Sequence, residues 1–174
     1  MRIRMSWTTW ALPALAVSAL LLMLVLVPHV GIAAKGARRW LGVGSIRVQP
    51  SEFAKLTLIV FLAHYLAKEK RRIDQFKRGF IVPMAVVGVT CLLALAEPDF
   101  GTTALMASVA LSMMFIAGVR LRYLVPTVLS GLVAFAVLVM HSPVRMKRML
   151  AFTDLEKYKA DHGYQVWQAM LAFG

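Results

Sequence analysis

The chain has 174 residues, of which 60% are hydrophobic and 16% are charged, and its formal net charge is +12. This composition excludes a soluble globular protein, because too little polar surface remains to cover one of this size. The high basicity does not indicate nucleic-acid binding, since Lys and Arg are scattered over the connections between apolar segments.

Five apolar segments are long enough to cross a bilayer as helices. About 18 residues, at about 1.5 Å rise per residue, extend roughly 27 Å, close to the ~30 Å thickness of the hydrocarbon core. The expected spans are residues 10–30, 50–67, 79–96, 101–119 and 123–140. The sequence therefore predicts an all-α polytopic membrane helical bundle, with residues 1–141 as a five-span transmembrane region.

The connection between the first two expected spans, residues 31–48, is predicted to be an interfacial loop. It contains Arg38 and Arg39 beside Trp40. Guanidinium groups can hold phosphate oxygens through paired hydrogen bonds. An ordinary interfacial anchor explains the same residues equally well. Both interpretations stay open.

The second expected span begins with charged residues inside it. Pro50, Ser51 and Glu52 are typical of a helix start, with proline in the first turn and an acidic side chain near the positive end of the dipole. Glu52 and Lys55 are three residues apart, so they share a helix face and can form an ion pair. Such a pair suggests an inward-facing polar pocket. Alternatively, Lys55 extends to the headgroups and Glu52 only caps the helix.

Residues 142–174 follow the last span and are predicted to begin a large extracytoplasmic loop. Arg145 and Arg148 share a face with Met149 and Phe152, a pattern typical of an amphipathic helix lying on the membrane. The two arginines serve either as a membrane anchor or as a ligand clamp. The four histidines of the chain match no metal-ligand spacing.

Orientation is not decided by total charge, because Lys and Arg number ten on each side of the five spans. The densest short loop, residues 68–78, favours a cytoplasmic position, with the N-terminus inside and the C-terminus outside. The ten basic residues left outside then predict an anionic ligand or lipid headgroups on that side.

Four ordered motifs carry a resemblance to a known family. They are residues 35–41 (KGARRWL), 47–56 (RVQPSEFAKL), 98–102 (PDFGT) and 163–165 (GYQ) with Gln168. The chain resembles the SEDS family, which comprises FtsW, RodA and SpoVE, the polytopic polymerases of bacterial peptidoglycan. Residues 64–67 (HYLA) and 163–174 are more similar to the cell-division member FtsW than to RodA.

The resemblance implies a glycosyltransferase of septal cell-wall synthesis that polymerises lipid II at the outer face of the bacterial cytoplasmic membrane. It implies a class B penicillin-binding protein transpeptidase and other division proteins as partners, and glycan linked to undecaprenyl pyrophosphate as a second substrate. Cationic side chains would stabilise the leaving pyrophosphate. The expected substrate-binding residues are Arg38, Arg39, Gln49, Glu52, Lys55, Arg145, Arg148, Gln165 and Gln168. No cofactor is identified from the residues, and the resemblance allows a divalent cation.

The resemblance also leaves a gap. Members of the family have about ten spans, and their catalytic aspartate would lie beyond Gly174 in this numbering. We therefore expect no catalytic residue in the chain, which looks like an internal fragment of the family fold and is expected to be inactive by itself. Two other functions stay open: a lipid II flippase, and a noncatalytic membrane scaffold for division proteins.

Overall fold

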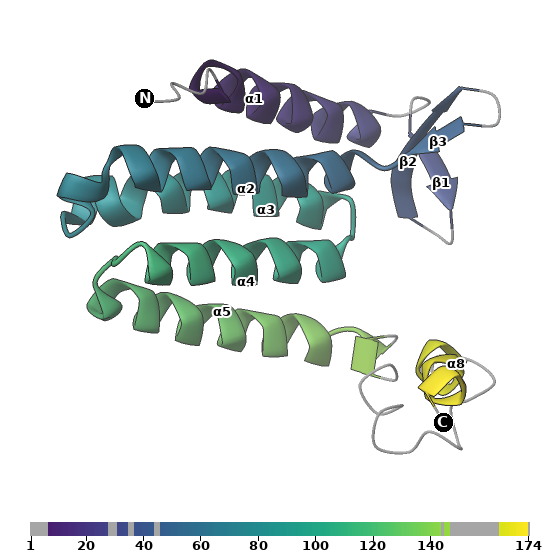
Figure 1. The fold of residues 1–174 in the computed structure, drawn as a ribbon. Helices are drawn as coiled ribbons and strands as arrows, with labels where there is room; N and C mark the ends of the chain where they lie inside the picture. Colours follow the sequence, from purple (N-terminus) through teal and green to yellow (C-terminus); the bar gives the residue numbers. More distant parts are fainter. Residues whose placement is uncertain are drawn as a thin grey trace. The chain divides into compact units, whose positions relative to one another are not determined.

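The computed structural model describes residues 7–27, 31–34, 37–43, 46–143, 145–146 and 164–173. This part of the chain consists mainly of long helices and a small sheet (Figure 1). The helices are α1 (Trp7–Leu26), α2 (Pro50–Lys68), α3 (Val82–Ala96), α4 (Phe100–Ile116), α5 (Leu121–Met140) and the shorter α8 (Tyr164–Phe173). A 3-10 turn, η1 (Lys70–Arg72), and a π-helical segment, η2 (Phe76–Ile81), connect α2 to α3.

The chain divides into two compact units, Met1–Leu124 and Val125–Gly174. The first unit contains α1 to α4 and the sheet, and the second contains most of α5 and all of α8. The predicted division at residues 141 and 142 refers to the position of the chain relative to the membrane and stays a prediction.

Each of the five expected spans corresponds to a helix whose ends differ from the expected ones by a few residues. The continuous segment Phe76–Ala96 and the helix Leu121–Met140 have the length and hydropathy of membrane spans. The segments Trp10–Leu26 and Phe100–Ile116 are apolar helices that are slightly shorter. α2 differs in carrying charged residues near both of its ends.

Local sequence explains both ends of α4. At the start, Asp99 is the N-cap, and its side chain accepts a hydrogen bond from the backbone N–H of Thr102. Past the end, Gly118 has a φ of +94°, a conformation that glycine adopts without strain. The N–H of Val119 donates to the carbonyl of Met114, as in a Schellman motif. These contacts stop the helix and turn the chain back toward α5.

A three-stranded antiparallel sheet lies between α1 and α2, where the sequence predicts only an interfacial loop. β1 (Ile32–Ala34) pairs with β2 (Ala37–Val43), and β2 pairs with β3 (Ile46–Val48). Two of the strands have three residues, which is too short for an alternating pattern to be recognised in sequence. The all-α prediction therefore holds for the membrane helices, and within the first unit the sheet lies at one end of α1 to α4 (Figure 1). We call this the sheet end.

The hydrophobic core of the first unit lies between α2, α3 and α4. Its buried residues on these helices are Leu58, Phe61, Leu62, Leu66, Val87, Ala94, Met106, Ala110 and Met114. Other faces of the helices expose large apolar side chains such as Leu56, Leu92 and Phe115. Exposed apolar faces are unfavourable in water but not in lipid, so this distribution fits a membrane bundle.

Candidate functional site

Polar side chains from two segments meet at the sheet end, around the turn between α3 and α4. Asp99 lies in this turn and is only 6% exposed. Its Oδ2 accepts hydrogen bonds from Gln49 Nε2 at 2.9 Å and from Thr102 Oγ1 at 2.8 Å, and Ser51 Oγ lies 3.4 Å away. Its Oδ1 accepts from the Thr102 backbone N–H at 3.2 Å. Asp99 therefore ties the beginning of α2 to the beginning of α4.

Arg39 connects the sheet to the same turn. Its Nε donates to the carbonyl oxygen of Glu97 at 3.1 Å, and its Nη2 donates to the carbonyl oxygen of Pro98. These carbonyls directly follow the last residue of α3, where the helix dipole is negative, so a guanidinium group stabilises this helix end. Arg39 thus positions the turn, in addition to the ligand-binding role predicted from sequence.

Glu97 is fully buried in this turn. Its side chain is 0% exposed, and neither of its carboxylate oxygens has a hydrogen-bond partner among the described residues. Burial raises the pKa of Glu97 to about 7, with a smaller contribution from the negative charge of Asp99, while Arg39 acts in the opposite direction. Below this pKa the Glu97 side chain is mainly protonated and neutral.

Glu52 and Lys55 form the ion pair that their spacing predicts. Lys55 Nζ lies 2.8 Å from Glu52 Oε1. The side chain of Lys55 is 20% exposed and that of Glu52 is 56% exposed, so Lys55 is the inner member of the pair. The predicted pairing is confirmed.

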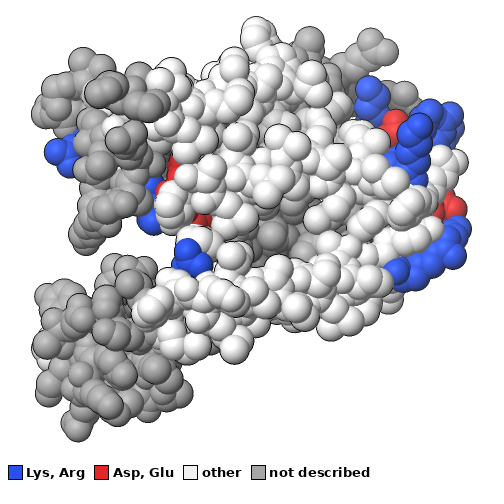
Figure 2. All heavy atoms as spheres, turned by 180° about the vertical axis from the view of Figure 1, so that it is seen from behind, with Lys and Arg blue, Asp and Glu red and all other residues white. Residues whose placement is uncertain are grey.

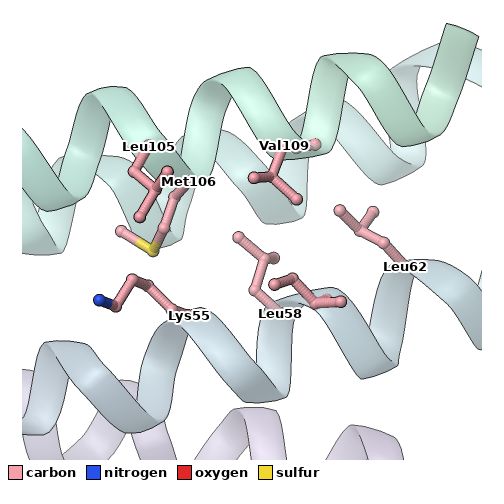
Figure 3. Close-up of a pocket in the computed structure, with 8 residues that line it drawn as sticks. Lys55, Leu58, Leu62, Leu105, Met106 and Val109 are labelled. Carbon is pink, nitrogen blue, oxygen red and sulfur yellow. The ribbon is translucent and has the colours of Figure 1, made fainter.

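A narrow cavity of about 70 Å³ lies next to Lys55, between α2 and α4. Figure 3 shows Leu58 and Leu62 of α2 facing Leu105, Met106 and Val109 of α4, with Lys55 at one end of the row. Apart from Lys55, every lining residue is apolar. The cavity therefore differs from the polar pocket predicted from sequence, because Glu52 is not among its lining residues and α4 supplies only apolar side chains.

The other predicted ligand residues are less completely described. The side chains of Arg38 and Gln165, and the whole of Arg148, lie outside the described residues. Arg145 and Gln168 belong to the second unit, where Arg145 Nη1 donates to the carbonyl oxygen of Leu138 at 2.6 Å. The predicted amphipathic helix around residues 145–152 lies mostly outside the described residues. The ligand roles of these residues stay predictions.

Four members of the sheet-end network were not predicted as site residues from sequence: Ser51, Glu97, Asp99 and Thr102. The spacing of Asp99 and Thr102 is that of a helix N-cap and the N–H it caps, so this contact can be recognised from sequence. The contact between Gln49 and Asp99 joins residues that are 50 positions apart, and no local pattern signals it. The burial of Glu97 is likewise a property of the packed turn.

Within the described ranges, no group of three or more His, Cys, Asp or Glu side chains is arranged to hold a metal ion. The divalent cation that the resemblance allows stays a prediction.

Comparison with known proteins decides the family. The family of FtsW, RodA and SpoVE, described as cell cycle proteins, matches residues 1–174. The chain belongs to this family. It is 39% identical over 168 residues to the probable peptidoglycan glycosyltransferase FtsW of Legionella pneumophila, and 37% identical over 169 residues to the stage V sporulation protein E of Bacillus subtilis. Both alignments cover 97% of this chain but only 43% and 46% of the relatives, so the chain spans less than half of their length.

Two solved structures of similar fold agree with this assignment. The rod shape determining protein RodA of Thermus thermophilus is 36% identical, with 78% of this chain and 42% of that chain covered and a TM-score of 0.65. A structure described as the structural coordination of polymerization and crosslinking by a peptidoglycan synthase complex is 30% identical. It covers 98% of this chain and 50% of that chain, with a TM-score of 0.70. The predicted polytopic membrane helical bundle, part of the SEDS fold, is confirmed.

Proposed function

We propose that this chain supplies the membrane bundle of a peptidoglycan glycosyltransferase that polymerises lipid II during septal cell-wall synthesis. The observation that carries the proposal is its 39% identity, over 97% of the chain, to a relative named as a probable peptidoglycan glycosyltransferase. The sheet end supports it, because Lys55 places positive charge at one end of an apolar cavity. Lipid II combines an anionic pyrophosphate with a long apolar chain.

In the proposed reaction, a hydroxyl group of the acceptor sugar attacks the growing glycan, and undecaprenyl pyrophosphate leaves. Cationic side chains stabilise the charge that develops on the pyrophosphate. The predicted ligand residues Arg38, Arg39 and Lys55 are assigned to this role. A general base is also needed to take the proton of the attacking hydroxyl.

The carboxylates described near the sheet end are poorly suited to act as this base. Asp99 already accepts hydrogen bonds from Gln49 and Thr102. Glu97 is 0% exposed, so a substrate hydroxyl has no access to it, and Glu52 is paired with Lys55. We therefore propose that the general base lies in the part of the relatives' sequence that does not align with this chain.

The partner proposed for this bundle is a class B penicillin-binding protein that crosslinks the new glycan. The support comes from the similar solved structure of a peptidoglycan synthase complex, which is described as coordinating polymerization and crosslinking. Polymer and crosslinks made at one place require the two activities to lie on the same side of the membrane.

For the orientation, we propose that the sheet end faces outward and that residues 68–78 are cytoplasmic, because these residues form the densest basic loop. In a Cys91→Ala background, which removes the only cysteine, we place single cysteines at Val48 and Gln75. Both positions are exposed and lie at opposite ends of α2. An impermeant thiol reagent added to intact cells should label position 48 and not position 75. Labelling of both positions, or of position 75 only, would contradict this topology.

The function itself is tested in a chimera in which residues 1–174 replace the matching segment of the Legionella pneumophila relative. Reconstituted in liposomes with lipid II, the chimera should form glycan strands that are visible on a gel. Absence of glycan, with the unmodified relative active in the same preparation, would contradict the proposed function.

A further inference from the structure

The end of the first unit opposite the sheet is strongly basic. It is formed by residues 68–78, which run from the last residue of α2 toward α3, and by residues 120–122, which include the first two residues of α5. Eight Lys and Arg residues and only two acidic residues give these segments a net charge of +6. Figure 2 shows Lys and Arg side chains gathered at this end of the molecule.

Both acidic residues of this basic end are used in internal ion pairs. Asp74 Oδ2 lies 3.0 Å from Arg120 Nη2, which joins the α2–α3 connection to the start of α5. Glu69 Oε2 lies 3.5 Å from Arg78 Nη1. In addition, Tyr65 donates its hydroxyl proton to the carbonyl oxygen of Arg78 at 2.9 Å, which fixes the chain after the loop against α2. These contacts hold the backbone of the loop in place.

The remaining cations of the loop point outward. Five side chains are exposed and make no ion pair with any described residue: Lys68, Lys70, Arg71, Arg72 and Lys77. We call these five residues the basic patch. Both acidic residues of this end are thus paired with arginines, and the five exposed cations leave an excess of positive charge at the surface.

Aromatic residues place the basic patch at the depth of lipid headgroups. Phe76 stacks on Phe80, with ring centroids 5.8 Å apart, and Tyr123 contacts both rings. Phe76 is 49% exposed and begins the membrane-spanning segment Phe76–Ala96. Aromatic rings at the end of a span are typical of the membrane interface. Lys77 directly follows Phe76, so the patch adjoins the phosphates of the leaflet that this end faces.

We propose that the basic patch is a binding site for anionic phospholipids, which use their headgroup phosphates to contact the five unpaired cations. Clusters of four to eight Lys and Arg beside a membrane span attract anionic headgroups, at roughly 1 kcal/mol per residue. The inference depends on the membrane fold and the geometry of the loop, and not on the proposed enzymatic activity.

The test measures the preference of the whole chain for one lipid class. The chain is reconstituted in phosphatidylcholine bilayers that contain either spin-labelled phosphatidylglycerol or spin-labelled phosphatidylcholine. The fraction of label immobilised at the protein surface gives the relative affinity for each lipid. We expect a preference for phosphatidylglycerol of about five-fold or more. A single Lys or Arg near the membrane surface contributes about this factor by itself.

Two matched variants separate charge from packing. In the first, all five residues of the basic patch are changed to Gln, and the preference should fall close to one. In the second, each Lys of these five is changed to Arg and each Arg to Lys, which keeps the charge, and the preference should be retained. An unchanged preference in the Gln variant, or its loss in the exchange variant, would overturn the proposal.

Two further measurements use the unmodified chain, so they do not depend on how the variants fold. The preference should fall as salt concentration rises, because exposed charges are screened. Inorganic phosphate added at constant ionic strength should not displace the lipid. A salt-independent preference, or the absence of any preference, would contradict the site. Displacement by phosphate would assign the patch to a soluble anion and overturn the lipid assignment.

Discussion

Residues 1–174 by themselves are expected to form no detectable glycan from lipid II, in liposomes where the chimera with the Legionella pneumophila relative is active. A sugar hydroxyl is a weak nucleophile at neutral pH, and a positioned general base typically contributes about 10²- to 10⁴-fold. The three carboxylates near the sheet end, Glu52, Glu97 and Asp99, are paired, buried or fully hydrogen-bonded. A substrate held by only part of its cavity also loses reactive geometry.

Comparing residues 1–174 with the chimera separates two possible errors, one in the proposed position of the general base and one in the proposed function. Both proteins are purified, reconstituted at equal density and incubated with lipid II, and glycan is followed by gel over time. We expect a rate for the chain that is lower by at least about 100-fold. Comparable rates would show that the base lies within these 174 residues. Glycan from neither protein would contradict the function instead.

Replacing Glu97 by Gln is expected to stabilise the chain at neutral and alkaline pH and to remove most of the pH dependence of its unfolding between about pH 4.5 and 7. The pKa of Glu97 is raised from 4.5 to about 7, because the side chain is buried and lies near Asp99. Between these values the folded chain holds a proton that the unfolded chain releases. Stability therefore falls as pH rises through this window and levels off above it.

The size of this effect follows from the same shift. A change of one pKa unit corresponds to about 1.4 kcal/mol, so ionisation of Glu97 costs the folded state up to about 3 kcal/mol. Gln has nearly the same shape as Glu and cannot ionise. Above pH 7, the thermal unfolding temperature of the Glu97→Gln variant should exceed that of the unmodified chain by several degrees. The two unfolding temperatures should converge near pH 4.5.

Glu52→Gln is the matched control, because it makes the same chemical change at a carboxylate whose side chain is 56% exposed. At pH values above 7, the Glu52→Gln variant should not have a higher unfolding temperature than the unmodified chain. Parallel pH profiles for Glu97→Gln and the unmodified chain would show that Glu97 is not held neutral in the folded state.

The helices of this fold could be predicted from sequence because apolar runs of membrane length are a local signal. The ion pair of Glu52 and Lys55 was predictable for the same reason, since three-residue spacing fixes a shared helix face. The sheet between α1 and α2 was missed, because its strands are too short to show a period.

The network around Asp99 depends on packing, which sequence periodicity does not report. Gln49 contacts Asp99 because the beginnings of α2 and α4 are neighbours in the fold. Arg39 contacts Glu97 because the sheet lies beside the turn between α3 and α4. The predicted phosphate-binding role of Arg39 remains untested, and the hydrogen bonds to the turn are an additional role that only the fold revealed.

We propose that the sheet end of this bundle contacts lipid II, and photocrosslinking in the chimera tests this contact. A photoreactive benzoylphenylalanine replaces either Phe53, beside Glu52 at the sheet end, or Phe76, at the basic end. These two phenylalanines are matched controls for each other, because they are 50% and 49% exposed. Irradiation with labelled lipid II should give an adduct at position 53 and little at position 76. An adduct at position 76 without one at position 53 would contradict the account.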